Sequence, residues 1–319
     1  MPVAPLPRLA LAAFLVAVGL VTIDAQRRSG GAREAGERSL AHGGRTRTYL
    51  VHDFARTTPA PVVIALHGGG GNADNAVTMT GFDRLAERDG FIAVYPNGTA
   101  RRDRRMLLTW NAGHCCAAAM EQRVDDVGFI GAMIDTLVAS GRADPARIYV
   151  TGMSNGGMMA HRLGRELSTK IAAIAPVVGA VFGDEPPPLA PMPAFIVVGA
   201  DDRVVPAAGG SLQLRGLLGN RSAADRDVAP AVAQADYWAR ANGCADPGRT
   251  TTPAASTVSY TRCTSGAPVI FHTVAGNGHA WPGGRAGRRG AAEPTKTFDA
   301  SEAMWAFFRT HRRANATGQ

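Results

Sequence analysis

The chain has 319 residues, of which 45% are hydrophobic, and this is enough apolar material for the core of one large domain. Its formal net charge is +8, from 34 basic and 26 acidic residues. The basic residues are almost all arginines, dispersed except for short clusters at 101–105 and 285–289, and no nucleic-acid-binding motif accompanies them. We therefore attribute the charge to compositional bias and expect no nucleic acid partner.

The N-terminus has the features of a secretory signal. Arg8 precedes an apolar run over residues 9–23, and Ala25 is a plausible cleavage residue. The run is shorter than the roughly 20 residues needed to span a membrane. The sequence predicts a signal peptide over 1–25 and a flexible leader over 26–44. It also predicts a secreted or periplasmic protein without stable membrane association after cleavage.

From residue 45 to 319, short apolar runs alternate with helical patterns. Strands are predicted at 47–54, 61–66, 91–95, 147–151, 171–178, 194–198, 258–262 and 268–275. Helices are predicted at 82–88, 124–140, from 157 onward, at 228–241 and at 298–311. This alternation favours a single α/β domain with a mainly parallel central sheet and helices on both faces. The long irregular region 207–227 is a candidate lid or substrate loop.

The pentapeptide Gly152-Met153-Ser154-Asn155-Gly156 lies between the predicted strand 147–151 and the helix that follows it. Strand, G-x-S-x-G and helix form the nucleophile-elbow pattern, in which a tight turn holds the serine in a strained conformation. Side chains two positions before and after the serine would collide, so both positions need glycine. The pattern predicts Ser154 as a nucleophile; a simple small-residue turn is the alternative.

A serine hydroxyl needs a base, and the base needs an orienting acid, in the chain order Ser, Asp or Glu, then His. His279 follows the last predicted strand in a Gly-rich loop and can act as the base. Asp201 and Asp202 both follow the strand 194–198, at the edge of the sheet where such sites lie. The strand position alone does not choose between the two aspartates.

A tetrahedral intermediate needs hydrogen-bond donors for its oxyanion. The backbone amide of Asn155 is one expected donor, and the loop His67-Gly68-Gly69-Gly70 supplies the other, for which we choose Gly69. Each donor is worth roughly 3 kcal/mol of barrier. The loop lacks the Lys-Ser/Thr ending of a phosphate-binding loop, and we expect no cofactor.

Four cysteines lie at 115, 116, 244 and 263. An oxidising compartment favours disulfides, and a bridge between Cys244 and Cys263 would pin the polar loop between them. Adjacent Cys115 and Cys116 could form a vicinal bridge, pair elsewhere or stay reduced. No C-x-x-C spacing is present, so we expect no metal site.

Taken together, these motifs resemble those of the secreted esterases of the polyhydroxybutyrate depolymerase family. These are α/β-hydrolases related to the feruloyl esterases of carbohydrate esterase family one. The matching segments are 66–72, Trp110-Asn111-Ala112-Gly113 leading to Cys115-Cys116, 124–129, 152–157, 199–206 and 278–283. The family's acid pattern resembles G-x-x-D-x-x-V-P, which counted from Gly199 selects Asp202. The chain departs from the family pattern at Ala117, at Asn277 and over 207–227.

The resemblance implies a serine carboxylesterase that acts on hydroxyalkanoate oligomers or short-chain esters. A feruloyl or acetyl xylan esterase is the alternative, and an inactive binding protein on the same fold is a remote one. Trp110 and Trp281 are predicted to line an acyl pocket, although tryptophans beside a cleft are as often packing residues. We expect no efficient attack on solid polyester, because no polymer-binding module follows the catalytic domain.

Overall fold

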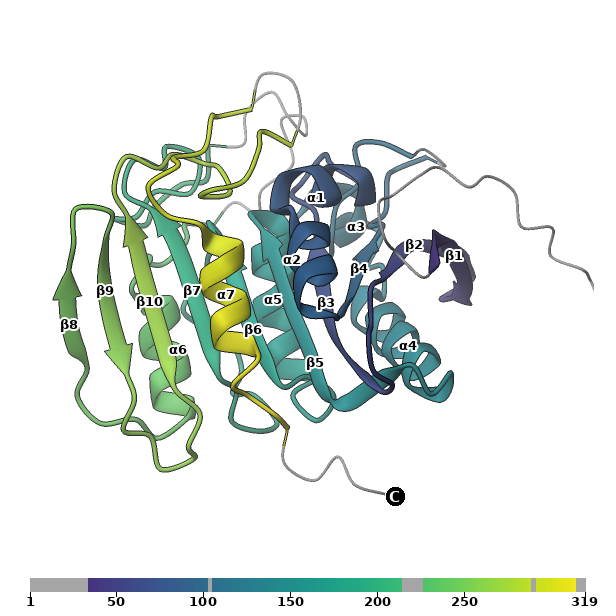
Figure 1. Ribbon diagram of the computed structural model, residues 1–319. Helices are drawn as coiled ribbons and strands as arrows, with labels where there is room; N and C mark the ends of the chain where they lie inside the picture. Colours follow the sequence, from purple (N-terminus) through teal and green to yellow (C-terminus); the bar gives the residue numbers. More distant parts are fainter. Residues whose placement is uncertain (1–33, 103–104, 214–225, 288–290, 314–319) are drawn as a thin grey trace, which may run out of the picture.

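The computed structural model describes residues 34–102, 105–213, 226–287 and 291–313 (Figure 1). Ten strands form one sheet in the order β1-β2-β4-β3-β5-β6-β7-β10-β9-β8. In that order, the strands are β1 (Glu34–His42), β2 (Arg45–Asp53), β4 (Ile92–Pro96), β3 (Ala60–Leu66), β5 (Ala143–Met153), β6 (Ala173–Val177), β7 (Ala194–Gly199), β10 (Val269–Val274), β9 (Ala255–Tyr260) and β8 (Gly248–Thr251).

The centre of the sheet, from β4 to β10, is parallel, and the strands at both ends are antiparallel. The central strands are continuous apolar runs because both of their faces are covered. Strands β4, β6 and β7 are buried along their whole length. The predicted α/β-hydrolase fold is therefore confirmed.

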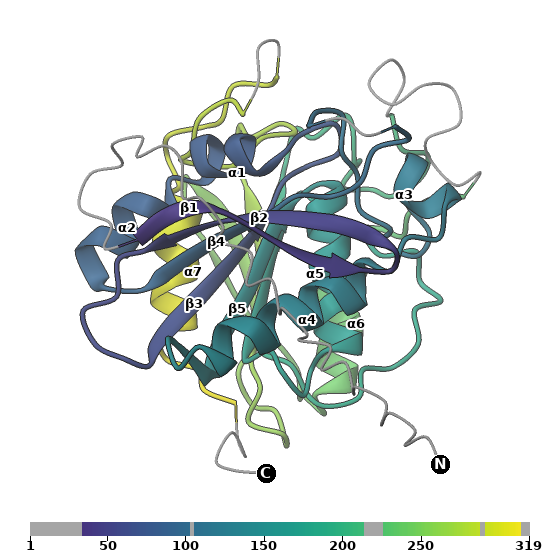
Figure 2. The same cartoon turned by 90° about the vertical axis from the view of Figure 1, so that its right-hand side faces the viewer.

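Helices cover both faces of the sheet, as Figures 1 and 2 show. On one face lie α1 (Ala73–Thr80), α2 (Phe82–Asp89) and α7 (Ala300–Phe308). On the other lie α4 (Asp126–Ala139), α5 (Asn155–Glu166) and α6 (Ala233–Ala241), with the short α3 (Ala117–Glu121) near one end of the sheet. Each face buries its own apolar cluster, one around Phe82 and Trp305 and the other around Phe129 and Trp238.

The structure adds four elements to the predicted ones: β1, α1, α3 and β8. Strand β1 corrects the flexible leader, because Glu34–His42 pair antiparallel with β2 along nine residues. Backbone hydrogen bonding forms this strand although most of its side chains are exposed. The predicted signal peptide and residues 26–33 lie outside the described residues. No helix in the described part of the chain has both the length and the apolar character to cross a membrane.

The predicted disulfide between Cys244 and Cys263 is present, and it links the end of α6 to the segment that follows β9. The sulfurs of Cys115 and Cys116 lie in contact with each other, which favours the vicinal arrangement among the three that the sequence leaves open. In the described residues there is no group of three or more His, Cys, Asp or Glu side chains placed to hold a metal ion.

Candidate active site

The turn between β5 and α5 has the backbone expected of a nucleophile elbow. Ser154 has a φ of 56°, a conformation that side-chain-bearing residues rarely adopt. A Cβ on Gly152 would come within 2.5 Å of the Gly156 carbonyl oxygen, and one on Gly156 would meet the His67 carbonyl oxygen at 2.5 Å. Because neither neighbour is a flexible side chain, only glycine fits at both positions, as the sequence predicts.

Three side chains that are far apart in the chain meet at this turn. The Nε2 atom of His279 lies 2.9 Å from Ser154 Oγ, and its Nδ1 atom lies 2.8 Å from Asp202 Oδ2. Hydrogen-bond contact from serine to imidazole to carboxylate is the arrangement that lets imidazole take a proton from the hydroxyl. Ser154 and Asp202 are buried, and the side chain of His279 is 16% exposed, so the site is open to a substrate.

Asp202, and not Asp201, contacts the imidazole. Its Oδ1 atom accepts hydrogen bonds from the amides of Val204 and Val205 at 2.8 and 2.9 Å, which fixes the carboxylate. Asp201 is exposed. One carboxylate oxygen of Asp202 therefore faces His279, and the other accepts hydrogen bonds that stabilise the loop after β7.

A cavity of about 250 Å³ opens beside Ser154 and His279. Most of its wall is apolar, with Met79, Met153, Met158, Val204 and Trp281 among the lining residues. Gly69 and Asn155, the two residues whose amides we expect to bind the oxyanion, line it as well. The amide of Gly69 has no hydrogen-bond partner among the described residues, whereas those of Gly70 and Gly71 do. The Asn155 amide is in the first turn of α5, where no intrahelical acceptor exists.

Comparison with known proteins agrees with this geometry. Residues 48–208 match the family model described as "Esterase PHB depolymerase", a match that covers β2 to β7 and includes both Ser154 and Asp202. The chain belongs to this family. It is a carboxylesterase on an α/β-hydrolase fold.

Individual relatives are distant. NocK of Nocardia uniformis subsp. tsuyamanensis, whose esterase activity is itself an inference, is 30% identical over 77% of this chain and 74% of its own length. Feruloyl esterase B of Piromyces equi is 30% identical over 73% of this chain, which corresponds to only 42% of that protein. The solved acetyl xylan esterase of Aspergillus awamori shares the fold, with a TM-score of 0.53 and 15% identity over 77% of this chain and 94% of that chain.

In this esterase Trp110 does not line the cavity, which corrects the prediction that it contacts substrate. Its indole is fully buried, and the Nε1–H group donates to the His67 carbonyl oxygen at 3.0 Å. Its backbone is paired with the Asn155 side chain: the Trp110 amide donates to Oδ1 at 2.7 Å, and Nδ2 donates to the Trp110 carbonyl at 3.0 Å. Trp110 therefore connects the elbow to the loop that holds Gly69. Trp281, by contrast, lines the cavity.

His67 fixes the start of that glycine loop. Its Nδ1–H group donates to the Gly68 carbonyl at 2.8 Å, and its Nε2 atom accepts the Gly98 amide at 3.0 Å. Complete burial lowers the pKa of His67 to about 4, so the ring is neutral at pH 7 and both nitrogens are satisfied. From the sequence, His67 is only the first residue of the glycine loop. Its place directly after a buried strand is the feature that could have predicted a structural role for the side chain.

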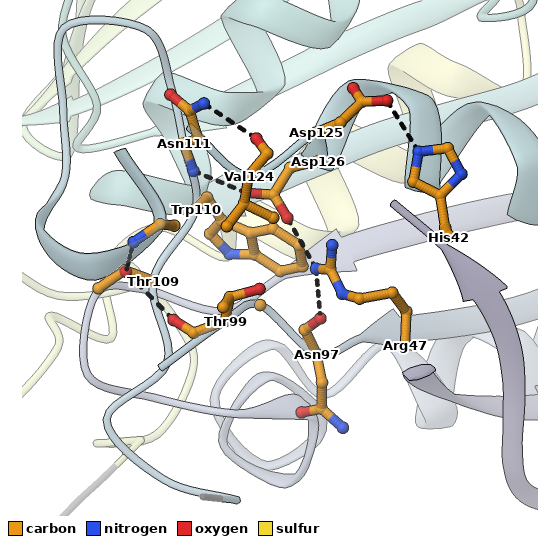
Figure 3. A network of polar contacts seen from close by, with 12 residues as sticks. His42, Arg47, Asn97, Thr99, Thr109, Trp110, Asn111, Val124, Asp125 and Asp126 are labelled. Atoms are coloured by element: carbon orange, nitrogen blue, oxygen red, sulfur yellow. Dashed lines mark hydrogen bonds and ion pairs between the residues drawn. The ribbon is translucent and has the colours of Figure 1, made fainter. Parts of the chain in front are cut away.

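A buried ion pair between a strand and a helix also stabilises the segment that carries Trp110 (Figure 3). Arg47 Nη2 lies 2.7 Å from Asp126 Oδ1, and Asp126 Oδ2 accepts the Asn111 amide at 2.8 Å. The guanidinium of Arg47 also lies over the Phe129 ring, 4.1 Å from its centroid. Asp126 belongs to the 124–129 motif, so this motif acts on the site through Asn111 and Trp110, without lining the cavity.

Asn277, which departs from the glycine expected before the histidine, shapes the loop of His279. Its Nδ2 atom donates to the carbonyls of Gly278 and Ala280 at 2.9 and 3.0 Å, and Oδ1 accepts the Thr295 amide at 3.2 Å. The side chain is completely buried. Asn277, which differs from the family pattern, therefore stabilises the loop that carries His279.

Two further predicted features lie beside the cavity. Cys115 and Cys116 are buried and form part of its wall. Of the predicted lid 207–227, residues 214–225 lie outside the described residues, while Gln213 lines the cavity. The described part of that region therefore takes part in the site.

Proposed function

We propose that this esterase cleaves its substrates through a covalent acyl-enzyme on Ser154. In this mechanism His279 takes the proton of the Ser154 hydroxyl as the oxygen attacks the ester carbonyl, and then gives it to the leaving alcohol. Asp202 keeps the imidazole oriented and stabilises its charge. The amides of Asn155 and Gly69 bind the oxyanion. The observation that carries the proposal is the unbroken contact from Ser154 Oγ through His279 to Asp202.

We propose short-chain esters and hydroxyalkanoate oligomers as the substrates. The cavity volume of about 250 Å³ lies just below the roughly 300–1,000 Å³ of typical small-molecule sites, which suits a short substrate. The apolar wall favours an aliphatic acyl chain, and Trp281 is its aromatic member.

The second candidate is a feruloyl or acetyl xylan esterase, and a specific similarity favours it. Feruloyl esterase B of Piromyces equi is 30% identical over 73% of this chain. The two candidates share the mechanism and differ in what fills the cavity. Steady-state rates on methyl ferulate and on 3-hydroxybutyrate oligomers separate them: we expect the higher kcat/KM on the oligomers, and a clear preference for methyl ferulate would reverse the order.

The mechanism itself is tested by replacing the nucleophile. We expect Ser154→Ala to lower kcat on p-nitrophenyl butyrate at least about 1000-fold, because no other group can form the acyl-enzyme. Ser256→Ala, which removes a hydroxyl from an exposed residue on β9, is the matched control and should retain the parent rate. A Ser154→Ala protein as active as the parent would remove the basis of the proposal.

We further propose that the protein is exported, with cleavage after residue 25. The disulfide between Cys244 and Cys263 supports an oxidising compartment, since such bridges are rare in reducing cytoplasm. N-terminal sequencing of the protein recovered from culture medium or periplasm is the test. We expect the mature chain to start at Gln26, and recovery only from the cytoplasm with an intact N-terminus would overturn the assignment.

A further inference from the structure

One cationic side chain lies at the mouth of the cavity and has no role in the proposed mechanism. Arg285 lines the same cavity as Ser154 and His279. Apart from the imidazole of His279, it is the only ionisable side chain among the described residues of the lining, and no acidic side chain is among them. Among the described residues, a largely apolar wall thus presents one permanent positive charge to whatever occupies the site.

The backbone of Arg285 is held in place by α1. We call residues 282–287, which follow His279 and Trp281, the strap. The Arg285 amide donates to the Met79 carbonyl at 3.2 Å, and Asn75 Nδ2 donates to the Gly287 carbonyl at 2.6 Å. A Cβ on Gly284 would overlap the Met79 carbonyl oxygen, so the strap lies directly against the helix. The position of Arg285 beside the cavity is therefore fixed by contacts on both sides of it.

The guanidinium of Arg285 has no hydrogen-bond or ion-pair partner among the described residues, and it is exposed. Other arginines on the same face of the sheet do have carboxylate partners: Arg84 pairs with Asp299 and Glu302, and Arg88 pairs with Asp89 and Glu302. A charge held at an apolar cavity without a counterion is available to an anionic group of a ligand. The net charge of +8 adds a long-range attraction for anions.

We propose that Arg285 is a carboxylate-binding residue that selects esters whose leaving alcohol bears a free carboxylate. Hydroxy-acid oligoesters are such substrates, because their terminal unit is an alcohol at one end and a carboxylate at the other. The guanidinium fork matches a carboxylate in geometry and can bind it through two parallel N–H···O hydrogen bonds. This inference rests on the proposed esterase mechanism and narrows its substrate class.

We assign the carboxylate to the alcohol side because the strap begins three residues after His279, the residue that gives its proton to the leaving oxygen. In the step concerned, the Ser154 Oγ–carbon bond forms and the bond from that carbon to the alcohol oxygen breaks. The alcohol leaves with the proton from His279 and with its carboxylate still ionised, so no further reactant is needed. A neutral sugar alcohol would gain nothing from Arg285.

The test compares two substrates that differ only in the charged group: the linear dimer of 3-hydroxybutyrate and its methyl ester. We expect the parent enzyme to favour the free acid by about tenfold in kcat/KM. Arg285→Gln should bring the ratio of the two rates to about one, and Arg285→Lys should keep part of the preference. Added salt should weaken the preference, because an exposed ion pair is screened.

Arg249→Gln is the matched control, since it removes the same charge from an exposed position on β8, at the far edge of the sheet. It should leave the ratio at the parent value. A parent enzyme without preference for the acid, or an Arg285→Gln variant that keeps the preference, would overturn the inference. Absence of hydrolysis on p-nitrophenyl butyrate as well would instead contradict the proposed function, so the two failures are distinguishable.

Discussion

At the scale of single residues, Asn155 does two separate things. Its backbone amide is a proposed oxyanion donor, and its side chain makes both hydrogen bonds to the backbone of Trp110. The indole of Trp110 in turn holds the His67 carbonyl, next to the glycine loop. Both proposed donors are therefore positioned by one buried tryptophan.

This arrangement predicts the effect of Asn155→Ala. The variant keeps the backbone amide that is the proposed oxyanion donor. It loses the two side-chain hydrogen bonds to Trp110, so the position of that amide is less restrained. We expect kcat on p-nitrophenyl butyrate to fall about tenfold with KM within twofold of the parent, since the oxyanion exists only after attack. Leaving the buried amide of Trp110 unpaired should also lower the free energy of unfolding by about 1 kcal/mol, whereas the Trp110 carbonyl still accepts from the amides of Ala112 and Cys116.

The comparison variant is Trp110→Phe, which keeps the backbone bonds to Asn155, removes the bond to the His67 carbonyl and leaves a small cavity where the larger indole packed. It should lower kcat less than Asn155→Ala does. Steady-state kinetics on folded protein, with urea unfolding in parallel, checks both variants. An Asn155→Ala enzyme in which KM changes and kcat does not would show that the side chain acts on substrate binding instead.

The sequence predicts the residues whose backbone or spacing is unusual. Ser154, its two glycines and the choice of Asp202 over Asp201 follow from steric limits and from the family pattern. The place of Trp110 does not follow, because a tryptophan at the rim of a sheet is compatible with packing or with substrate contact. Only the partners of its indole and backbone, which come from distant parts of the chain, decide between them.

At the scale of secondary structure elements, the Arg47–Asp126 pair ties β2 to α4 and to the segment that carries Trp110 (Figure 3). Both side chains are buried, at 4% and 0% exposure. Removing one partner of a buried ion pair lowers the free energy of unfolding strongly, because the other charge stays buried without a counterion. Replacing both partners with neutral groups lowers it much less.

We therefore expect Arg47→Met to lower the free energy of unfolding by about 3 kcal/mol, because it leaves the Asp126 carboxylate buried without its cation. The double variant Arg47→Met with Asp126→Asn should recover part of that loss. Urea unfolding of the parent, both single variants and the double variant gives the coupling energy. If the losses in free energy of unfolding of the two single variants simply add in the double variant, the interaction between Arg47 and Asp126 contributes nothing to stability.

Strands and helices with strong periodicity are predicted from the sequence to within a few residues, as β3 and α2 are. The missed elements have weaker patterns. Strand β1 is mostly exposed and its residues do not alternate between polar and apolar, so only its pairing with β2 identifies it. Helix α1 is short and follows directly on the glycine loop; the signal that was available is Asn72, whose side chain caps it by accepting from the Asn75 amide at 3.0 Å.

At the scale of the whole molecule, two buried histidines link stability to pH. Burial lowers the pKa values of His67 and His161 to about 4. In both rings the unprotonated nitrogen already accepts a hydrogen bond, from the Gly98 amide in His67 and from the Trp238 indole in His161. Protonation in the folded state would break these bonds, so both rings stay neutral until the pH approaches 4.

The sign of the effect follows from proton binding. Between about pH 4 and the unfolded value near 6.5, the unfolded chain binds protons that the folded protein does not, so the free energy of unfolding rises with pH. From pH 7 to 5.5 each histidine should remove about 1 kcal/mol. Urea unfolding at both pH values checks this, and His161→Gln should show a smaller pH dependence than the parent. An unchanged dependence in that variant would contradict the assignment.

The proposed mechanism depends most on Ser154 being an activated nucleophile, and active-site labelling measures this directly. The protein is incubated with a fluorophosphonate, and its intact mass and peptides are analysed. We predict one adduct per chain, on the peptide that contains Ser154, and labelling slowed by at least about a hundredfold in His279→Asn. A folded protein that takes up no label, or takes it up on another residue, would contradict the proposed mechanism.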